Sequence, residues 1–203
     1  MPTPNASTFK KLSKTVEQII LGIDPGTRLM GYALIEVEGN KAKLITMDVL
    51  SLLKIQSHEL RIKKIFDTTR QIIDTHHPDF LAIEAPFYGK NVQSMLKLGR
   101  AQGVAIAAAL ARDIPFCEYE PRRVKQSVTG NGAASKEQVA AMMQRLLNFR
   151  EMPQHLDATD ALAVAYCHFL SNFGSIPQAT PKTKKKNTSW AAFISENQSR
   201  IIK

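Results

Sequence analysis

Residues 19–26, with the sequence IILGIDPG, decide the fold of this chain of 203 residues. An uninterrupted apolar run that ends in an acid, a proline and a glycine is typical of a buried strand followed by a tight turn. Asp24 is therefore predicted at the point where a central strand leaves the core, at one end of a sheet.

The hydrophobic patterns of the segments that follow predict a particular order of strands and helices. Residues 31–37 and 42–47 are predicted strands, and residues 38–41 form the hairpin turn between them. Two further strands are predicted at 80–84 and 115–119, alternating with helices at 59–76, 92–112, 121–128, 135–148 and 157–169. The order predicts an α/β fold: a five-stranded mixed sheet, three antiparallel strands followed by two parallel ones, with helices on both faces.

The composition is that of a globular protein with one core, since 44% of the residues are hydrophobic and 22% are charged. No apolar run approaches the roughly 18–20 residues of a membrane span, and the N-terminus lacks the apolar segment of a secretory signal. Cys117 and Cys167 fit no metal-binding or disulfide spacing. We therefore expect a cytoplasmic protein without thiol chemistry and without a membrane partner.

The formal net charge of +9 is unevenly distributed along the chain. Residues 88–150 carry ten Lys or Arg against four acids, whereas residues 151–174 carry three acids and no Lys or Arg. A basic stretch is commonly a solvated surface, but a pI near 9.6 favours a polyanionic partner. We expect residues 1–17 to be a disordered N-terminal extension and residues 175–203 a flexible basic C-terminal tail, on either side of one folded domain, residues 18–174.

Four acids occupy positions next to apolar segments, where burying a carboxylate costs free energy. Asp24 and Glu84 each end an apolar strand, and Asp157 and Asp160 share one face at the start of an apolar helix. Four carboxylates at one place would repel one another, and a divalent cation such as Mg²⁺ or Mn²⁺ removes that repulsion. The four acids are therefore a candidate metal site.

Each acid also has a simpler explanation when it is considered alone. Asp24 could be the first residue of a turn, and Asp157 could be an N-cap with Asp160 in the first turn. Glu84 could pair with a lysine. The combination of all four with the predicted strand order favours the metal site.

Five motifs in this order resemble the RuvC family of Holliday-junction resolvases, members of the ribonuclease H-like superfamily. The resemblance covers residues 19–172. The motifs are ILGIDPGT at 20–27 with Gly31 and Tyr32, AIE at 82–84 with Phe87, KLGRAQGVA at 97–105, VKQ at 124–126, and DATDALA at 157–163. It implies that residues 18–174 are a RuvC-like nuclease domain with a ribonuclease H-like sheet.

The resemblance implies a crossover junction endodeoxyribonuclease that acts in homologous recombination and repair. Such an enzyme makes two symmetric, Mg²⁺-dependent cuts in a four-way DNA junction and leaves 5′-phosphate and 3′-hydroxyl ends. The implied tetrad, which binds two Mg²⁺ ions, falls on Asp24, Glu84, Asp157 and Asp160. Some relatives have His in place of the third acid; this chain has Asp157 there, and His155 is expected to be an exposed loop residue. The family also implies a homodimer and a branch-migration helicase partner of the RuvA/RuvB kind.

Further residues receive roles from the same match. Lys125 and Lys136 stand where the family has functional lysines near the scissile strand, and Phe87 where an aromatic ring stacks on unpaired bases. Solvated lysines and a core phenylalanine are the alternatives. Further candidates for contacts with the DNA backbone are Lys90, Lys97, Arg100, Arg122 and Arg123. The Gly- and Ala-rich stripe of the predicted helix 92–112 is compatible with a dimer interface or with packing on its own sheet.

Three other functions compete. Residues 23–27 (IDPGT) resemble the phosphate-binding turn of actin-like ATPases, but those proteins need a second such domain, for which 203 residues leave no room. A ribonuclease acting on RNA–DNA hybrids has a similar carboxylate cluster. A non-catalytic DNA-binding module would keep the acids for structure, although unneutralised acids that face phosphate weaken binding.

Overall fold

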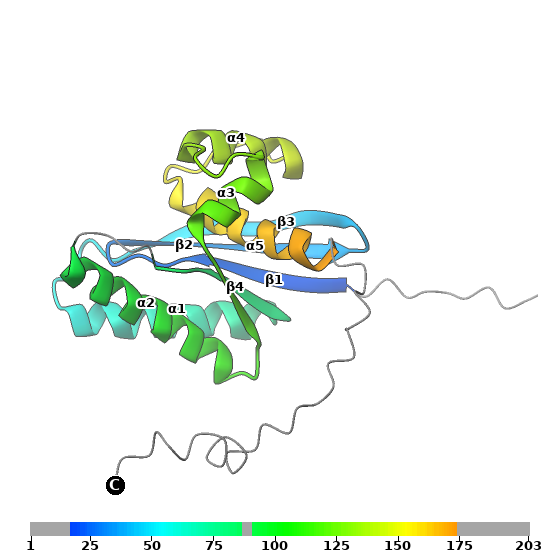
Figure 1. Ribbon diagram of the computed structural model, residues 1–203. Coiled ribbons are helices and arrows are strands. Elements are labelled where there is room, and N and C mark those ends of the chain that lie inside the picture. Colours follow the sequence, from blue (N-terminus) through cyan, green and yellow to red (C-terminus); the bar gives the residue numbers. More distant parts are fainter. Residues whose placement is uncertain (1–16, 87–90, 174–203) are drawn as a thin grey trace, which may run out of the picture. The chain divides into compact units, whose positions relative to one another are not determined.

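The computed structural model describes residues 17–86 and 91–173, and within them the strands and helices follow one another in the predicted order (Figure 1). The strands are β1 (Glu17–Asp24), β2 (Leu29–Glu38), β3 (Lys41–Ser51), β4 (Phe80–Glu84) and β5 (Phe116–Tyr119). The helices are α1 (His58–His76), α2 (Val92–Leu110), α3 (Pro121–Thr129), α4 (Lys136–Leu147) and α5 (Asp157–Phe173).

The five strands form one mixed sheet in the order β3-β2-β1-β4-β5. β1 and β3 are antiparallel to β2, whereas β4 is parallel to both β1 and β5. The predicted sheet is therefore confirmed, with β1 at its centre. Several predicted bounds were short: β3 continues to Ser51 because its pairing with β2 extends as far as Leu29, beyond a register shift near Leu34.

Alternate residues of β1 face opposite layers of the protein. Ile20 packs in one core cluster with α3, α4 and α5. Leu21 and Ile23 pack in the other cluster, with α1 and α2. Figure 1 shows the same division, with α1 and α2 on one face of the sheet and α5 on the other. Even-numbered positions of β1 therefore face α5.

Helix α5 packs directly against the backbone of β1 and β2 where these strands carry glycines. A Cβ atom added to Gly22 would come within 2.8 Å of the Cβ atom of Ala165. A Cβ atom added to Gly31 would come within 2.5 Å of the carbonyl carbon of Asp157. These two glycines fix the height of α5 above the sheet, and with it the position of the helix's first turn.

Helices α3 and α4 cover α5 on the side away from the sheet, so that α5 is buried between two layers. Helix α4 begins with a capping box: the Ser135 side chain accepts from the backbone of Gln138, and the Gln138 side chain accepts from the backbone of Ser135. This cap fixes Lys136 as the first residue of the helix.

The predicted terminal extensions fall almost wholly on residues 1–16 and 174–203, which lie outside the described part of the chain. β1 begins at Glu17, the last residue of the expected N-terminal extension. None of the helices that the structure describes has the length and apolar character needed to cross a membrane.

Candidate metal centre

The parallel pairing of β1 and β4 places Asp24 and Glu84 side by side. The register pairs Gly22 with Ala82 and Ile23 with Ile83, so that Asp24 and Glu84 occupy the next position on each strand. Because side chains alternate along a strand, both acids lie on the face that α5 covers. Two acids that are far apart in the sequence therefore meet at the carboxyl ends of neighbouring strands.

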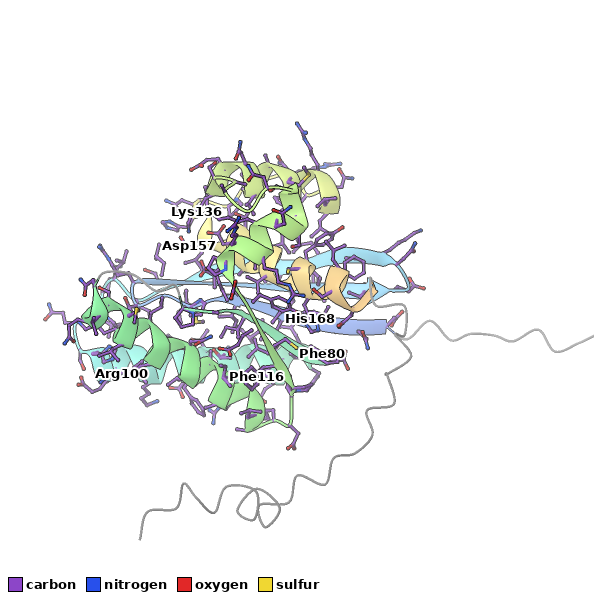
Figure 2. All side chains as sticks on the ribbon, viewed as in Figure 1. Phe80, Arg100, Phe116, Lys136, Asp157 and His168 are labelled. Carbon is purple, nitrogen blue, oxygen red and sulfur yellow. The ribbon has the colours of Figure 1, made fainter. Side chains whose placement is uncertain are left out.

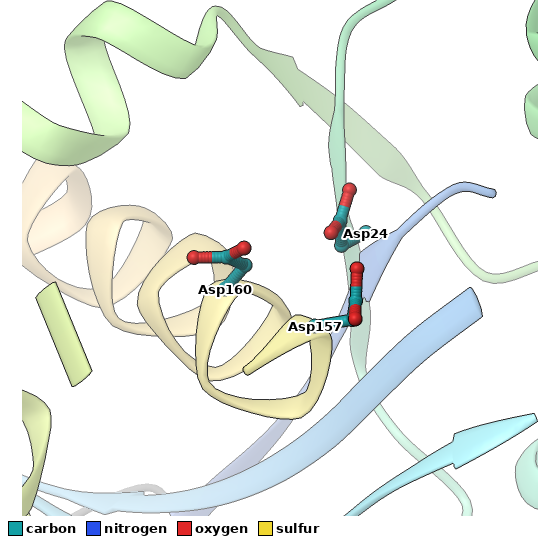
Figure 3. A group of neighbouring side chains, drawn as sticks. All are labelled: Asp24, Asp157 and Asp160. Carbon is teal, nitrogen blue, oxygen red and sulfur yellow. The ribbon is translucent and has the colours of Figure 1, made fainter. Parts of the chain in front are cut away.

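The first turn of α5 adds two more acids to the same place. Asp24, Asp157 and Asp160 each offer a carboxylate oxygen, and these atoms all lie within 4.8 Å of one another (Figure 3). A pocket of about 220 Å³ is lined by Asp24, Asp160 and Glu84, together with the two predicted lysines, Lys125 and Lys136. The structure thus gathers all four predicted acids.

The surroundings of these acids oppose ionisation. Burial, and next the charge of Glu84, raise the pKa of Asp24 well above its ordinary value. Burial, followed by the charge of Asp160, raises the pKa of Glu84 to about 7. Burial also raises the pKa of Asp160, although contact with Lys136 opposes that rise. The cluster therefore carries carboxylates that lack enough positive charge to stabilise them.

Lys136 reaches into the cluster from the start of α4. Its Nζ atom lies 2.5 Å from Oδ2 of Asp160 and 3.5 Å from Oδ1 of Asp157. Figure 2 shows Lys136 and Asp157 on the same side of the sheet. Burial alone would lower the pKa of Lys136, but the hydrogen bond to Asp160 and the nearby acids raise it overall. One ammonium group only partly balances four carboxylates.

The donor set fits a hard divalent cation. The converging side chains of Asp24, Glu84, Asp157 and Asp160 offer carboxylate oxygens, the ligand type that Mg²⁺ and Mn²⁺ prefer. The raised pKa values of Asp24, Glu84 and Asp160 show that Lys136 supplies too little positive charge to stabilise these carboxylates in their ionised form.

The other predicted basic residues have different surroundings. Arg122 and Lys125 line a larger pocket of about 890 Å³ beside the acids, between the end of β4, α3 and residues 131–133. Arg123 donates from Nη2 to Oγ of Ser171 at 3.2 Å, and its guanidinium lies 5.2 Å from the centre of the Tyr119 ring. Arg123 is thus exposed, lies over the Tyr119 ring and does not line the acid pocket.

Lys97 and Arg100 are exposed on α2 and do not line the acid pocket. Figure 2 places Arg100 on the opposite side of the sheet from Lys136. Phe87 and Lys90 lie outside the residues that the structure describes. His155 is exposed, as expected.

Sequence reasoning assigned no role to two residues that shape the site, Gly31 and Gln102. Gly31 lies directly beneath the Asp157 carbonyl. Gln102 is buried on α2 and bonds to the end of β4. A signal was present for Gln102, because Ala101 and Ala105 mark its surroundings on the helix as apolar, and a polar side chain there needs a partner.

Residues 20–168 match the sequence model of the family described as crossover junction endodeoxyribonuclease RuvC. The match spans all four acids and both lysines of the pocket. This chain belongs to the RuvC family.

Individual RuvC proteins agree with this membership. The crossover junction endodeoxyribonuclease RuvC of Christiangramia forsetii is 53% identical over 195 residues, which cover 96% of this chain and 98% of that protein. Two structures of Thermus thermophilus RuvC each cover 77% of this chain and 96% of theirs. One is 31% identical with a TM-score of 0.69, and the other, in complex with a Holliday junction substrate, is 29% identical with a TM-score of 0.72. The predicted ribonuclease H-like fold is confirmed.

Proposed function

We propose that this chain is a structure-specific endonuclease that resolves four-way DNA junctions in homologous recombination and repair. The observation that carries the proposal is the cluster of Asp24, Asp157 and Asp160, with Glu84 lining the same pocket as Asp24 and Asp160, in a chain of the RuvC family. A member of that family has been solved with a Holliday junction substrate. The reaction is a pair of symmetric phosphodiester cuts that leave 5′-phosphate and 3′-hydroxyl ends.

The four carboxylates are the proposed ligands of two Mg²⁺ ions, for which Mn²⁺ would be a substitute. Bound ions would supply a water molecule of lowered pKa and would stabilise negative charge on the leaving 3′-oxygen. Asp24 would be a central ligand, because its carboxylate lies close to those of both Asp157 and Asp160. Glu84 completes the set from the neighbouring strand.

Lys125 and Lys136 are the proposed catalytic lysines. Both line the acid pocket, at the side where α3 and α4 meet it. A lysine at that position offsets the additional negative charge of a pentavalent phosphorus. In the structure the Lys136 ammonium is held by Asp160, so it stays at the pocket without substrate.

The proposed path of the DNA backbone follows the larger pocket that Arg122 and Lys125 line, directly beside the acids. Contacts of this kind position the strand without reading its sequence. Lys97, Arg100 and Arg123 remain proposed backbone contacts outside this pocket. Phe87 and Lys90 belong to the same proposal, as the stacking aromatic residue and a further phosphate contact.

A homodimer is the proposed assembly, because a four-way junction offers two equivalent strands to a two-fold symmetric enzyme. Helix α2 supports it. Its buried alanines, Ala101, Ala105, Ala108 and Ala109, pack on its own core. A different stripe of the helix offers small and apolar residues at helical spacing, namely the exposed Val92, Leu96, Gly103, Ala107 and Leu110 and the partly exposed Gly99. The exposed row is separate from the alanines that pack on the core, and we propose that a second copy binds there.

The remaining proposals concern the partner complex of the protein and its location in the cell. A branch-migration helicase complex of the RuvA/RuvB kind is the proposed partner, on the family resemblance alone. The proposed location is the cytoplasm, where the bacterial chromosome is accessible.

The decisive experiment compares substrates. Purified protein is incubated with a four-way junction, an RNA–DNA hybrid duplex and ATP, each with and without Mg²⁺. Paired symmetric nicks in the junction alone, dependent on Mg²⁺, are the expected result. Cleavage of the hybrid would favour a ribonuclease, ATP hydrolysis an actin-like ATPase, and binding without nicks a non-catalytic module.

The Asp24→Asn variant tests the site assignment within that experiment. It removes one charge from the acid pocket and leaves the basic residues in place. We expect junction cleavage to be abolished and junction binding in EDTA to be retained, as measured by gel shift. Normal cutting by this variant would show that the metal site has been assigned wrongly.

A further inference from the structure

Gln102 connects α2 to the strand end that carries Glu84. The side chain is 6% exposed, and its Nε2 atom donates to the backbone carbonyl oxygen of Glu84 at 3.2 Å and to Oε1 of Glu118 at 2.6 Å. A side-chain amide has two N–H groups, so both hydrogen bonds form at once. Gln102 thereby ties β4 and β5 to the helix.

The carbonyl that Gln102 holds would otherwise have no strand partner. β4 pairs with β1 in a parallel register that ends at Ile83 and Ile23. One further step of this register would present the backbone nitrogen of residue 25 to the Glu84 carbonyl, and Pro25 has no N–H group. The amide of Gln102 supplies the donor that Pro25 lacks.

The peptide group after Glu84 is therefore held on both sides. Its carbonyl accepts from Gln102, and its N–H, which belongs to Ala85, donates to the carbonyl of Tyr119 at 2.9 Å. This peptide joins Glu84 to Ala85, and Pro86 follows as the last described residue before residues 87–90. A fixed peptide there restricts the direction in which the Glu84 side chain can point.

Such a restriction is needed because the acids repel one another. Glu84 lines the same pocket as Asp24 and Asp160, so that like charges face one another there when no cation is bound. We propose that Gln102 is a positioning residue, which holds the Glu84 peptide so that the carboxylate stays directed at the metal site. The inference rests on the proposed function, since it assumes that Glu84 is a metal ligand.

Three variants separate this role from a merely structural one. Gln102→Met keeps the approximate shape of the side chain and removes both donors. Glu118→Gln is the conservative control, because its amide oxygen still accepts from Gln102. The double variant Gln102→Glu with Glu118→Gln keeps the total charge and restores the bond between residues 102 and 118 with donor and acceptor exchanged, but offers no donor to the Glu84 carbonyl.

The readouts are the affinity of the DNA-free full chain for Mn²⁺, measured by calorimetry, and kcat for junction cleavage at saturating DNA and Mg²⁺. Hydrogen-bond partners that orient metal ligands typically change affinity or activity by about 10–100-fold. We expect a loss of this size in Gln102→Met and in the double variant, and wild-type values in Glu118→Gln. Junction binding in EDTA should be unchanged in all three.

A lowered melting temperature with wild-type Mn²⁺ affinity and kcat would overturn the proposal, because Gln102 would then serve the fold alone. Recovery of both values in the double variant would also overturn it, since the bond to Glu118 would be sufficient. Where Gln102→Met does not fold, the double variant decides. If the wild-type chain itself binds no Mn²⁺, the proposed metal site fails first, and the positioning role fails with it.

Discussion

A methyl group added at Gly31 would strike the first turn of α5 and move the acids that this turn carries. The new Cβ atom would lie 2.5 Å from the Asp157 carbonyl carbon and 3.2 Å from the backbone nitrogen of Ala158. Both are backbone atoms at the start of a long buried helix, so neither can rotate away. Gly31→Ala is therefore a direct test of whether the height of α5 above the sheet sets the site.

The displacement follows from the contact distances. An ordinary contact of a Cβ atom begins at 3.4 Å, so the carbonyl carbon alone requires the start of α5 to retreat by at least about 0.9 Å from β2, and the Asp157 carbonyl oxygen lies closer still. A misplacement of about 1 Å at a reacting centre costs on the order of 100-fold in rate. Overpacking of this kind also lowers the free energy of unfolding by about 1–3 kcal/mol. Gly31→Ala should therefore lose both stability and activity.

The assay must separate these two losses. We expect Gly31→Ala to cut the junction about 100-fold more slowly at saturating DNA and Mg²⁺, and to bind Mn²⁺ more weakly in calorimetry. The control is Ile73→Ala on α1, in the core cluster on the other face of the sheet. That substitution costs about 2–5 kcal/mol of stability and leaves the acids in place, so the folded variant should cut and bind Mn²⁺ like the wild type.

The reasoning is refuted if Gly31→Ala retains wild-type kcat and Mn²⁺ affinity below its melting temperature. It is equally refuted if Ile73→Ala loses kcat to the same extent, because a general loss of stability would then explain both variants.

Three further predictions concern the charges of the pocket and the proposed dimer. Lys136→Gln removes the ammonium that contacts Asp160, so Mn²⁺ affinity should rise, the melting temperature in EDTA should fall and cleavage should slow. The control Lys63→Gln, which breaks an exposed ion pair on α1, should change none of these three quantities. Unchanged Mn²⁺ affinity in Lys136→Gln would contradict the prediction. The pKa of Glu84 is raised from 4.5 to about 7, so its contribution to stability in EDTA is present below pH 4.5 and is lost as the pH rises through 7. Because protons compete with the cation, the gain in melting temperature on adding Mg²⁺ should grow between about pH 6 and 8; a gain independent of pH would contradict this. Leu96→Glu, on the exposed stripe of α2, should shift the protein to a monomer in sedimentation, and a dimer that persists would place the interface elsewhere.

Local patterns in the sequence were sufficient for the elements and their order. The apolar run of residues 19–23, the capping box of Ser135 with Gln138 and the alternation of strands with helices each depend on residues a few positions apart. The carboxylates were recognisable for the same reason: Asp24 and Glu84 each follow an apolar strand directly, and Asp157 and Asp160 share a helical face.

The Gly- and Ala-rich stripe on α2 is a feature whose packing partner local patterns could not predict. Its composition of Gly and Ala predicts close packing but not the partner. Only the structure divides it, into alanines that face the protein's own core and a separate row, including Gly99 and Gly103, that lies open. Likewise, the sequence placed Lys136 near the acids by resemblance, but its ion pair with Asp160 depends on how α4 packs on α5.

By itself the sequence determined which residues are acidic, which strand or helix end carries each of them, and that they belong to a mixed sheet between helices. The tertiary structure decided that Asp24 and Glu84 lie in register on neighbouring strands. It also decided that the Asp157 backbone packs directly on Gly31, and that Gln102 donates a hydrogen bond to the end of β4. The physical reason is the separation along the chain of the residues that interact. Periodicity and capping act over a few residues, whereas strand register and helix height are set by packing between segments far apart in the chain, where a shift of one residue in a strand would turn its acid to the opposite face.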